Sequence, residues 1–118
     1  MDHQNNMDVL EKLRKIQAQF ASNRNWDKYH RPKNLAMALS VEVSELVEIF
    51  QWLDNDEIKL KLENKKFKES IEDEIADILL YLIRIAEKTE IDIEKVTLNK
   101  IEKNRKKYPI NKNNNYLK

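Results

Sequence analysis

The sequence predicts an all-α fold in one domain, and three observations support this prediction. Apolar residues recur at helical spacing in four segments, whereas no stretch alternates apolar and polar residues as a half-buried strand does. Charged residues make up 36% of the chain and hydrophobic residues 41%, which is typical of a helical protein in water. The length of 118 residues suits one domain with a modest core, so association with further copies is expected.

The first two helices are expected on either side of an aromatic connection. The first covers residues 7–22, and one of its faces carries Leu10, Leu13, Ile16, Gln17 and Phe20. The polar and aromatic stretch NRNWDKYHRPKN follows it. The second helix is predicted over residues 35–53, with Asn34 as its N-cap.

Two further helices are expected in the second half of the chain. The charged, weakly periodic stretch IKLKLENKKFK predicts a short helix or an excursion with a solvated face. The third and fourth helices are predicted over residues 69–88 and 93–107, with Asp92 as the N-cap of the fourth. Residues 1–110 therefore form the predicted domain, and NKNNNYLK (111–118) is predicted to be a disordered tail.

The composition excludes several classes of function. Lys and Arg number 22 against 21 Asp and Glu, so no nucleic-acid partner is expected. The absence of cysteine excludes disulfides and thiolate metal sites, and the absence of glycine excludes P-loops and dinucleotide fingerprints. No apolar run is long enough for a membrane span, and MDHQNNMDVL has no signal-peptide core, so a cytoplasmic location is expected.

Two acid-x-x-acid pairs occupy the same position on the second and third predicted helices. The pairs are Glu42 with Glu45 and Glu74 with Asp77. At about 100° per residue, the first acid of each pair falls inside the apolar face and the second about 60° away, at its margin. The apolar neighbours of Glu42 within about 40° are Leu35, Leu46, Ile49 and Leu53.

Carboxylates on apolar faces predict a metal site. An unpaired carboxylate in a core is unfavourable by several kcal/mol or takes up a proton. Neither apolar face carries an inward-facing Lys or Arg, except Arg84 and Lys88 at the margin of the third helix. Four converging carboxylates with oxygen ligands alone suit Mg²⁺, with Mn²⁺ as an alternative. A di-iron bundle is excluded because it needs Glu-x-x-His motifs, and neither histidine follows a Glu by three residues.

Aromatic residues accompany the acids. Trp52 follows Glu45 by seven residues and Tyr81 follows Glu74 by seven, so each lies two helical turns from an acid. Such aromatics are usually core residues, but beside a metal cluster they also suit the wall on which a planar base stacks. The preceding connection adds Trp26, Tyr29 and His30.

These residues carry a resemblance to a known family. FASNRNWDKYHRPKNLAMALSVEVSELVEIFQW and EDEIADILLYLIRIAEKTEIDIEKVTLNKIEKNRKKYP resemble the dCTP pyrophosphatases, which belong to the MazG-like all-α nucleoside triphosphate pyrophosphohydrolases. The match runs from about Phe20 to Pro109. The two acid pairs alone indicate the superfamily, whereas NWDKYHRPKNL, FQW and NRKKYP indicate the dCTP branch. The resemblance implies a four-helix MazG-like bundle assembled as a dimer or tetramer, with pockets lined by more than one subunit.

The resemblance also implies roles for individual residues. Glu42, Glu45, Glu74 and Asp77 would ligate Mg²⁺ and serve catalysis. The nucleotide pocket would contain Trp26, Asp27, Lys28, Tyr29, His30, Trp52 and Tyr81. Candidates for phosphate contacts are Lys100, Asn104 and Arg105. Gln17 stands near the base where relatives carry a histidine, and its amide donates and accepts hydrogen bonds but carries no charge.

The implied reaction is hydrolysis of dCTP, or of a modified dCTP, to dCMP and pyrophosphate. Water would attack the α-phosphorus beside Mg²⁺, with Glu45 as one candidate to orient or deprotonate it. The cellular role would be sanitation of the deoxynucleotide pool. Two alternatives stay open: a MazG-like enzyme that prefers dUTP, dTTP or another triphosphate, and a non-catalytic helical oligomerisation module whose acids are structural.

Overall fold

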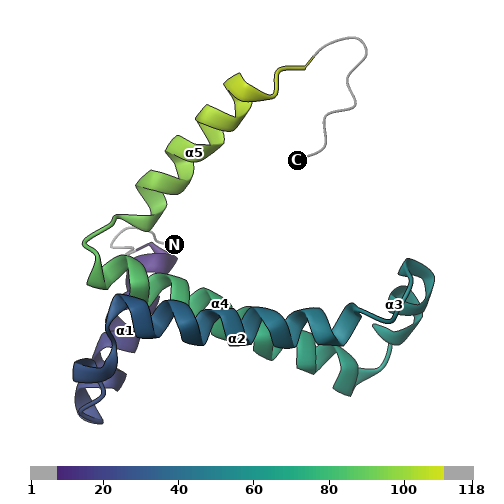
Figure 1. Cartoon of the computed structure of the whole chain (residues 1–118), viewed down its shortest axis with the longest axis horizontal. Coiled ribbons are helices and arrows are strands. Elements are labelled where there is room, and N and C mark those ends of the chain that lie inside the picture. The colour runs from purple at the N-terminus through teal and green to yellow at the C-terminus, as the bar shows by residue number, and fades with distance from the viewer. Residues whose placement is uncertain (1–7, 111–118) are drawn as a thin grey trace.

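The described part of the chain is entirely helical. The structure, a computed structural model, describes residues 8–110. In chain order the elements in this range are α1 (Val9–Asn23), the short 3-10 helix η1 (Asp27–Tyr29), α2 (Pro32–Phe50), α3 (Asn55–Lys61), α4 (Lys65–Lys88) and α5 (Ile93–Lys107) (Figure 1). The all-α prediction is confirmed. The predicted tail at 111–118 and the first residues of the predicted domain lie outside the described residues.

The start of α2 differs from the prediction. The helix begins at Pro32, and Arg31 is its N-cap. Proline suits the first helical turn because its φ is fixed near the helical value and its missing N–H would have no partner there. The prediction of Asn34 as the N-cap is therefore wrong. Its side-chain amide instead donates a hydrogen bond to the Tyr29 carbonyl oxygen at 3.3 Å, which ties α2 to the end of η1.

The charged stretch after α2 is helical. Asp54 and Glu57 form a reciprocal capping box that starts α3. α4 then begins at Lys65, earlier than predicted, because the Asn64 side chain accepts a hydrogen bond from a backbone N–H of the first turn. The described residues thus contain five α-helices, namely the four predicted ones and a short helix, which is one of the two expectations for the charged stretch. The predicted Asp92 cap of α5 is confirmed.

α2 and α4 form the main pair of helices. They lie side by side, and α1 packs across the C-terminal half of α4 (Figure 1). α5 leaves the end of α4 and extends away from the other helices (Figure 1). The radius of gyration is 18.0 Å, against about 13 Å for a compact chain of this size. The fold is consequently open.

Much apolar surface of the described residues is not covered. Their buried apolar side chains are Ala21, Leu35, Ile83 and Ala86. Large apolar side chains of α2, α4 and α5 stay exposed, namely Met37, Val41, Val43, Val47, Ile75, Leu79, Leu82, Val96, Leu98 and Ile101. Exposed apolar surface on this scale marks an interaction site. Within residues 8–110, none of the helices combines the length and the apolar character that a membrane span needs.

The absence of glycine leads to a first prediction, on stability. Asn25 and Glu90 leave α1 and α4 with φ values of 57° and 58°. A left-handed conformation is unfavourable for a residue with a Cβ atom, whereas asparagine tolerates it better than glutamate. Glu90→Gly is expected to raise the free energy of unfolding by about 1 kcal/mol in urea titrations. Asn25→Gly, the matched control, should have a smaller effect; an unchanged or lower midpoint for Glu90→Gly would contradict the prediction.

Candidate active site

Three of the four predicted acids converge between α2 and α4. Glu42, Glu45 and Glu74 each offer a carboxylate oxygen, and these oxygens lie within 4.8 Å of one another. Glu42 and Glu74 are half-buried and Glu45 is exposed, so the first acid of each pair is the more buried one, as its position on the helix predicts. Asp77 is exposed and lies outside this acidic cluster. The acidic cluster is defined here as Glu42, Glu45 and Glu74.

Mutual repulsion within the acidic cluster favours proton uptake. The pKa of Glu74 is raised to about 7, first because its protonated form hydrogen-bonds Glu42, and then through burial and the neighbouring charge of Glu45. One oxygen of Glu74, Oε1, is buried without a hydrogen-bond partner among the described residues. A buried oxygen without a donor, beside two further carboxylates, fits a hard divalent cation that prefers oxygen ligands.

A cavity of about 350 Å³ opens beside the acidic cluster, between α1, the residues that flank η1, α2 and α4. Its apolar lining consists of Leu13, Ile16, Phe20, Ala21, Leu35 and Leu80. Its polar and aromatic lining consists of Gln17, Trp26, His30, Glu42, Asp77, Tyr81 and Arg84. Glu42 belongs to both the cavity and the acidic cluster. A ligand seated in the cavity would therefore have one end next to the three carboxylates.

The cavity combines flat apolar surfaces with groups that hydrogen-bond. Trp26 meets Phe20 edge to face at 5.7 Å between ring centroids, and the Arg24 guanidinium stacks on Phe20 at 3.4 Å. The pKa of the Tyr81 hydroxyl is raised, mainly by burial and then by the charges of Glu42 and Asp77. Gln17 has a buried amide oxygen without a partner among the described residues, so this oxygen is available to a ligand.

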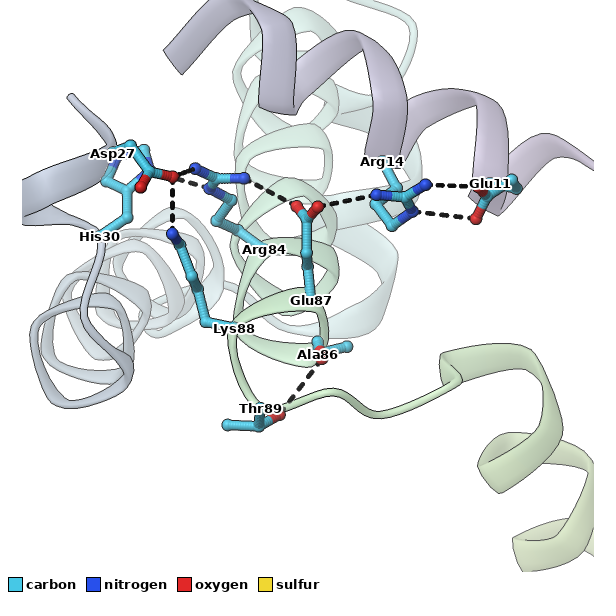
Figure 2. Close-up of polar contacts among 9 residues, drawn as sticks. All are labelled: Glu11, Arg14, Asp27, His30, Arg84, Ala86, Glu87, Lys88 and Thr89. Carbon is cyan, nitrogen blue, oxygen red and sulfur yellow. Dashed lines mark hydrogen bonds and ion pairs between the residues drawn. The ribbon is translucent and has the colours of Figure 1, made fainter. Parts of the chain in front are cut away.

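Trp26 and His30, which flank η1, line the cavity, whereas the three residues of η1 itself do not. Asp27 forms ion pairs with Arg84 and Lys88 of α4, both at 2.6 Å (Figure 2). These charges hold the pKa of Asp27 below its usual range, chiefly through the hydrogen bond from Lys88. Lys28 lies over the ring of Tyr29, which is 61% exposed, and neither residue lines the cavity.

Besides the η1 residues, four further predicted binding residues lie outside the cavity of this single chain. Trp52 follows the end of α2 and is 86% exposed. Lys100, Asn104 and Arg105 lie on α5, which extends away from the other helices (Figure 1). Arg105 pairs with Glu102 of the same helix at 2.6 Å. Their roles in binding therefore stay predictions.

Arg84 is the charged cavity residue that the site prediction missed, along with the apolar lining. It is 2% exposed and lines the cavity. Its guanidinium donates hydrogen bonds to Asp27 in η1, to His30 after η1 and to Glu87 in α4. A signal was present in the sequence, because Arg84 follows Asp77 by seven residues and so lies two turns along the same side of α4.

Comparison with known proteins identifies the family. The model of the MazG-like family matches residues 37–118. The crystal structure of a pyrophosphatase from Archaeoglobus fulgidus superposes with a TM-score of 0.81 at 42% sequence identity, and the match covers 93% of this chain and 99% of that one. The chain belongs to the MazG-like family, which confirms the resemblance found in the sequence.

Within this family, the chain is similar to curated dCTP pyrophosphatases. The dCTP pyrophosphatase 1 of Bos taurus is 36% identical over 102 residues, which make up 86% of this chain and 60% of that protein. The dCTP pyrophosphatase 1 of Homo sapiens is 36% identical over 101 residues, with 86% and 59% covered. The chain thus spans about 60% of the length of the curated relatives it matches.

Proposed function

We propose that this protein hydrolyses dCTP, or a modified dCTP, to dCMP and pyrophosphate with the help of a divalent cation. The observation that carries the proposal is the position of Glu42, which lines the cavity and belongs to the acidic cluster. A nucleotide whose base lies in the aromatic cavity would extend its phosphates toward the carboxylates. A cation is needed there because both groups are negatively charged. The names of the relatives, dCTP pyrophosphatase 1 and pyrophosphatase, support the same reaction.

The acidic cluster would hold the cation, which we propose to be Mg²⁺ or Mn²⁺. Glu42 and Glu74 are half-buried and would be its inner ligands, and Glu74 Oε1 has no other partner among the described residues. Asp77, on the cavity wall, would complete the set. When bound, the cation supplies positive charge for the phosphate oxygens.

The chain's own residues would bind the nucleotide and move one proton. Trp26 and the apolar wall would hold the base and exclude water from it. Glu45 is exposed, so its carboxylate can accept a proton from a water molecule at the acidic cluster. The water oxygen then bonds to the α-phosphorus, the bond from that phosphorus to the α–β bridging oxygen breaks, and pyrophosphate leaves.

A second substrate preference has an observation in its favour. The amide oxygen of Gln17 is unpartnered among the described residues. An amide has both a donor and an acceptor, so by rotating it can pair with the edge of cytosine or with that of uracil or thymine. Hydrolysis of dUTP or dTTP by the same mechanism is therefore the alternative within the family.

A panel of triphosphates tests the proposal. Pyrophosphate release would be measured for dCTP, 5-methyl-dCTP, dUTP, dTTP and dATP with Mg²⁺, with Mn²⁺ and with EDTA. We expect the highest kcat/KM for a cytosine nucleotide and no turnover in EDTA. A higher kcat/KM for dUTP or dTTP would support the alternative substrate, and no turnover of any triphosphate would leave the non-catalytic oligomer as the better account.

We also propose that the protein acts as a homo-oligomer, a dimer or a dimer of dimers. The uncovered apolar side chains of α2, α4 and α5 favour such an assembly over an isolated chain. A second copy would bring Trp52 and the α5 residues Lys100, Asn104 and Arg105 to its neighbour's cavity. Light scattering coupled to size exclusion measures the mass directly, and a monomeric mass would contradict this part of the proposal.

A further inference from the structure

Arg84 has no part in the proposed function so far, although it is the one charged side chain among residues 8–110 that is almost fully buried, at 2% exposure. Burial of a guanidinium is unfavourable unless its donors all find acceptors. The partners of Arg84 therefore indicate what its charge does in this position.

Each nitrogen of the Arg84 guanidinium donates to a different residue. Nη1 donates to Glu87 Oε1 at 2.7 Å and Nη2 to Asp27 Oδ1 at 2.6 Å. Nε donates to Nδ1 of His30 at 2.9 Å. Figure 2 shows the guanidinium between the side chains of Asp27 and His30 on one side and Glu87 on the other. Two of the three bonds thus reach the segment that forms one wall of the cavity.

The bond to His30 determines which ring nitrogen carries the proton. Arginine is always protonated and its Nε can only donate, so Nδ1 of His30 must be the acceptor. In a neutral imidazole the other nitrogen, Nε2, then carries the hydrogen. Nε2 has no hydrogen-bond partner among the described residues, and His30 lines the cavity. The free donor is therefore on the edge of the ring opposite Arg84.

The surroundings of His30 keep its ring neutral. Its pKa is lowered, first by burial and then by the positive charges of Arg84 and Lys88, against the opposing effect of Asp27. A charged imidazole would have protons on both nitrogens and would face the Arg84 donor with a donor of its own. Geometry and charge consequently favour the same neutral tautomer.

We propose that Arg84 is a positioning residue, which holds His30 in the Nε2–H tautomer so that the cavity wall presents one fixed hydrogen-bond donor to an acceptor on the nucleoside. This inference rests on the proposed function, since it takes a nucleotide to be the ligand. Carbonyl oxygens of pyrimidines and hydroxyl oxygens of the sugar are acceptors of the required kind. In the same cavity the free oxygen of Gln17 is an acceptor, whereas the indole N–H of Trp26 is a further donor.

The tautomer is measured by ¹⁵N NMR, without any ligand. The chain has two histidines, so a His3→Gln background leaves His30 as the single imidazole. At about pH 7.5 we expect Nε2 protonated and Nδ1 unprotonated in this background. In Arg84→Lys, which keeps the charge but loses the Nε donor, we expect a mixture of tautomers. A protonated Nδ1 in the background protein, or an unchanged spectrum in Arg84→Lys, would overturn the inference.

Ligand affinity provides the second measurement. A dCTP analogue with a non-hydrolysable α–β bridge would be titrated calorimetrically in the presence of Mg²⁺. Loss of one fixed donor is expected to weaken its Kd about tenfold in Arg84→Lys. The matched control is Arg14→Lys, because Arg14 bonds Glu87 in the same ionic network (Figure 2) but does not line the cavity. Arg14→Lys should bind like the wild type, and equal weakening in both variants would indicate a purely structural network.

A pair of His30 variants keeps the test valid if Arg84→Lys does not fold. Glutamine places an amide N–H near the position of Nε2, whereas leucine has no donor. We expect Kd to rise less in His30→Gln than in His30→Leu, and equal values would overturn the inference. The proposed reaction and the proposed role of Arg84 can fail separately. Tight binding of the analogue without turnover of dCTP by the wild type would contradict the reaction alone. Turnover by the wild type together with an unchanged Kd in Arg84→Lys would contradict the role of Arg84 alone.

Discussion

Glu74→Gln is expected to lower kcat/KM for the best triphosphate at least about a hundredfold, because loss even of a residue that only supports a metal ligand lowers affinity or activity about 10- to 100-fold. Glutamine keeps the shape of the side chain but removes one of the carboxylates that would hold the cation. Pyrophosphate release at saturating Mg²⁺ measures the effect. Glu72→Gln is the matched control, because Glu72 is exposed on the same helix and lies outside the acidic cluster.

The same substitution should stabilise the cation-free protein at alkaline pH. The pKa of Glu74 is raised from 4.5 to about 7 by the acidic cluster and by burial. Between these two values the folded state binds more protons than the unfolded state, so stability falls as the pH rises and is lowest above about 7. A glutamine at this position stays neutral, so the variant does not lose stability in this way as the pH rises. In EDTA, the Tm of Glu74→Gln should therefore exceed that of the wild type at about pH 8 and approach it at about pH 4.5.

The response to the cation separates a metal site from acids that are merely structural. Mg²⁺ or Mn²⁺ should raise the Tm of the wild type and of Glu72→Gln, since a ligand that binds only the folded state stabilises it. Glu74→Gln should show little of this increase. Full activity in Glu74→Gln, or a Tm of the wild type that is the same with and without divalent cations, would contradict the assignment of the acidic cluster.

The acidic cluster was accessible from the sequence because its causes are local. The helical period places Glu42 and Glu74 inside apolar faces, and the unfavourable burial of a lone carboxylate implies that such faces meet around a cation. The structure brings Glu42, Glu45 and Glu74 together accordingly. The position of Asp77 on the cavity wall rather than in the acidic cluster depends on how α2 and α4 are rotated against each other, which the period does not define.

Other parts of the site depend on contacts between distant segments. Arg84 bonds His30 and Asp27, which precede it by 54 and 57 residues, and no local rule pairs these side chains. The helix starts differ in how far the sequence predicts them. The N-cap of α5 follows from Asp92 alone. The charged stretch after α2 has no clear helical period, and its helices α3 and α4 are started by the caps Asp54 and Asn64. The direction of α5 is likewise not encoded in its own residues.

Subunit complementation should be the largest effect of the proposed assembly. Trp52 is 86% exposed and lies outside the cavity of its own chain. If it stacks on a nucleotide held by a second copy, Trp52→Ala should weaken kcat/KM by about tenfold or more, since base stacking contributes about 1–3 kcal/mol. Glu42→Gln should inactivate the site of its own chain. Each homo-oligomer would then be defective for a different reason.

A mixed oligomer of these two variants distinguishes a shared site from a self-contained one. The two chains, co-expressed with different tags and purified through both, would form one site with Glu42 and Trp52 intact and one site with neither. Per mixed dimer, about half of the wild-type activity should therefore return. A site built within one chain predicts instead the average of the two defective proteins. Because the two predictions differ several-fold in the same assay, recovery would place Trp52 at its neighbour's cavity, and the average value would exclude it from there.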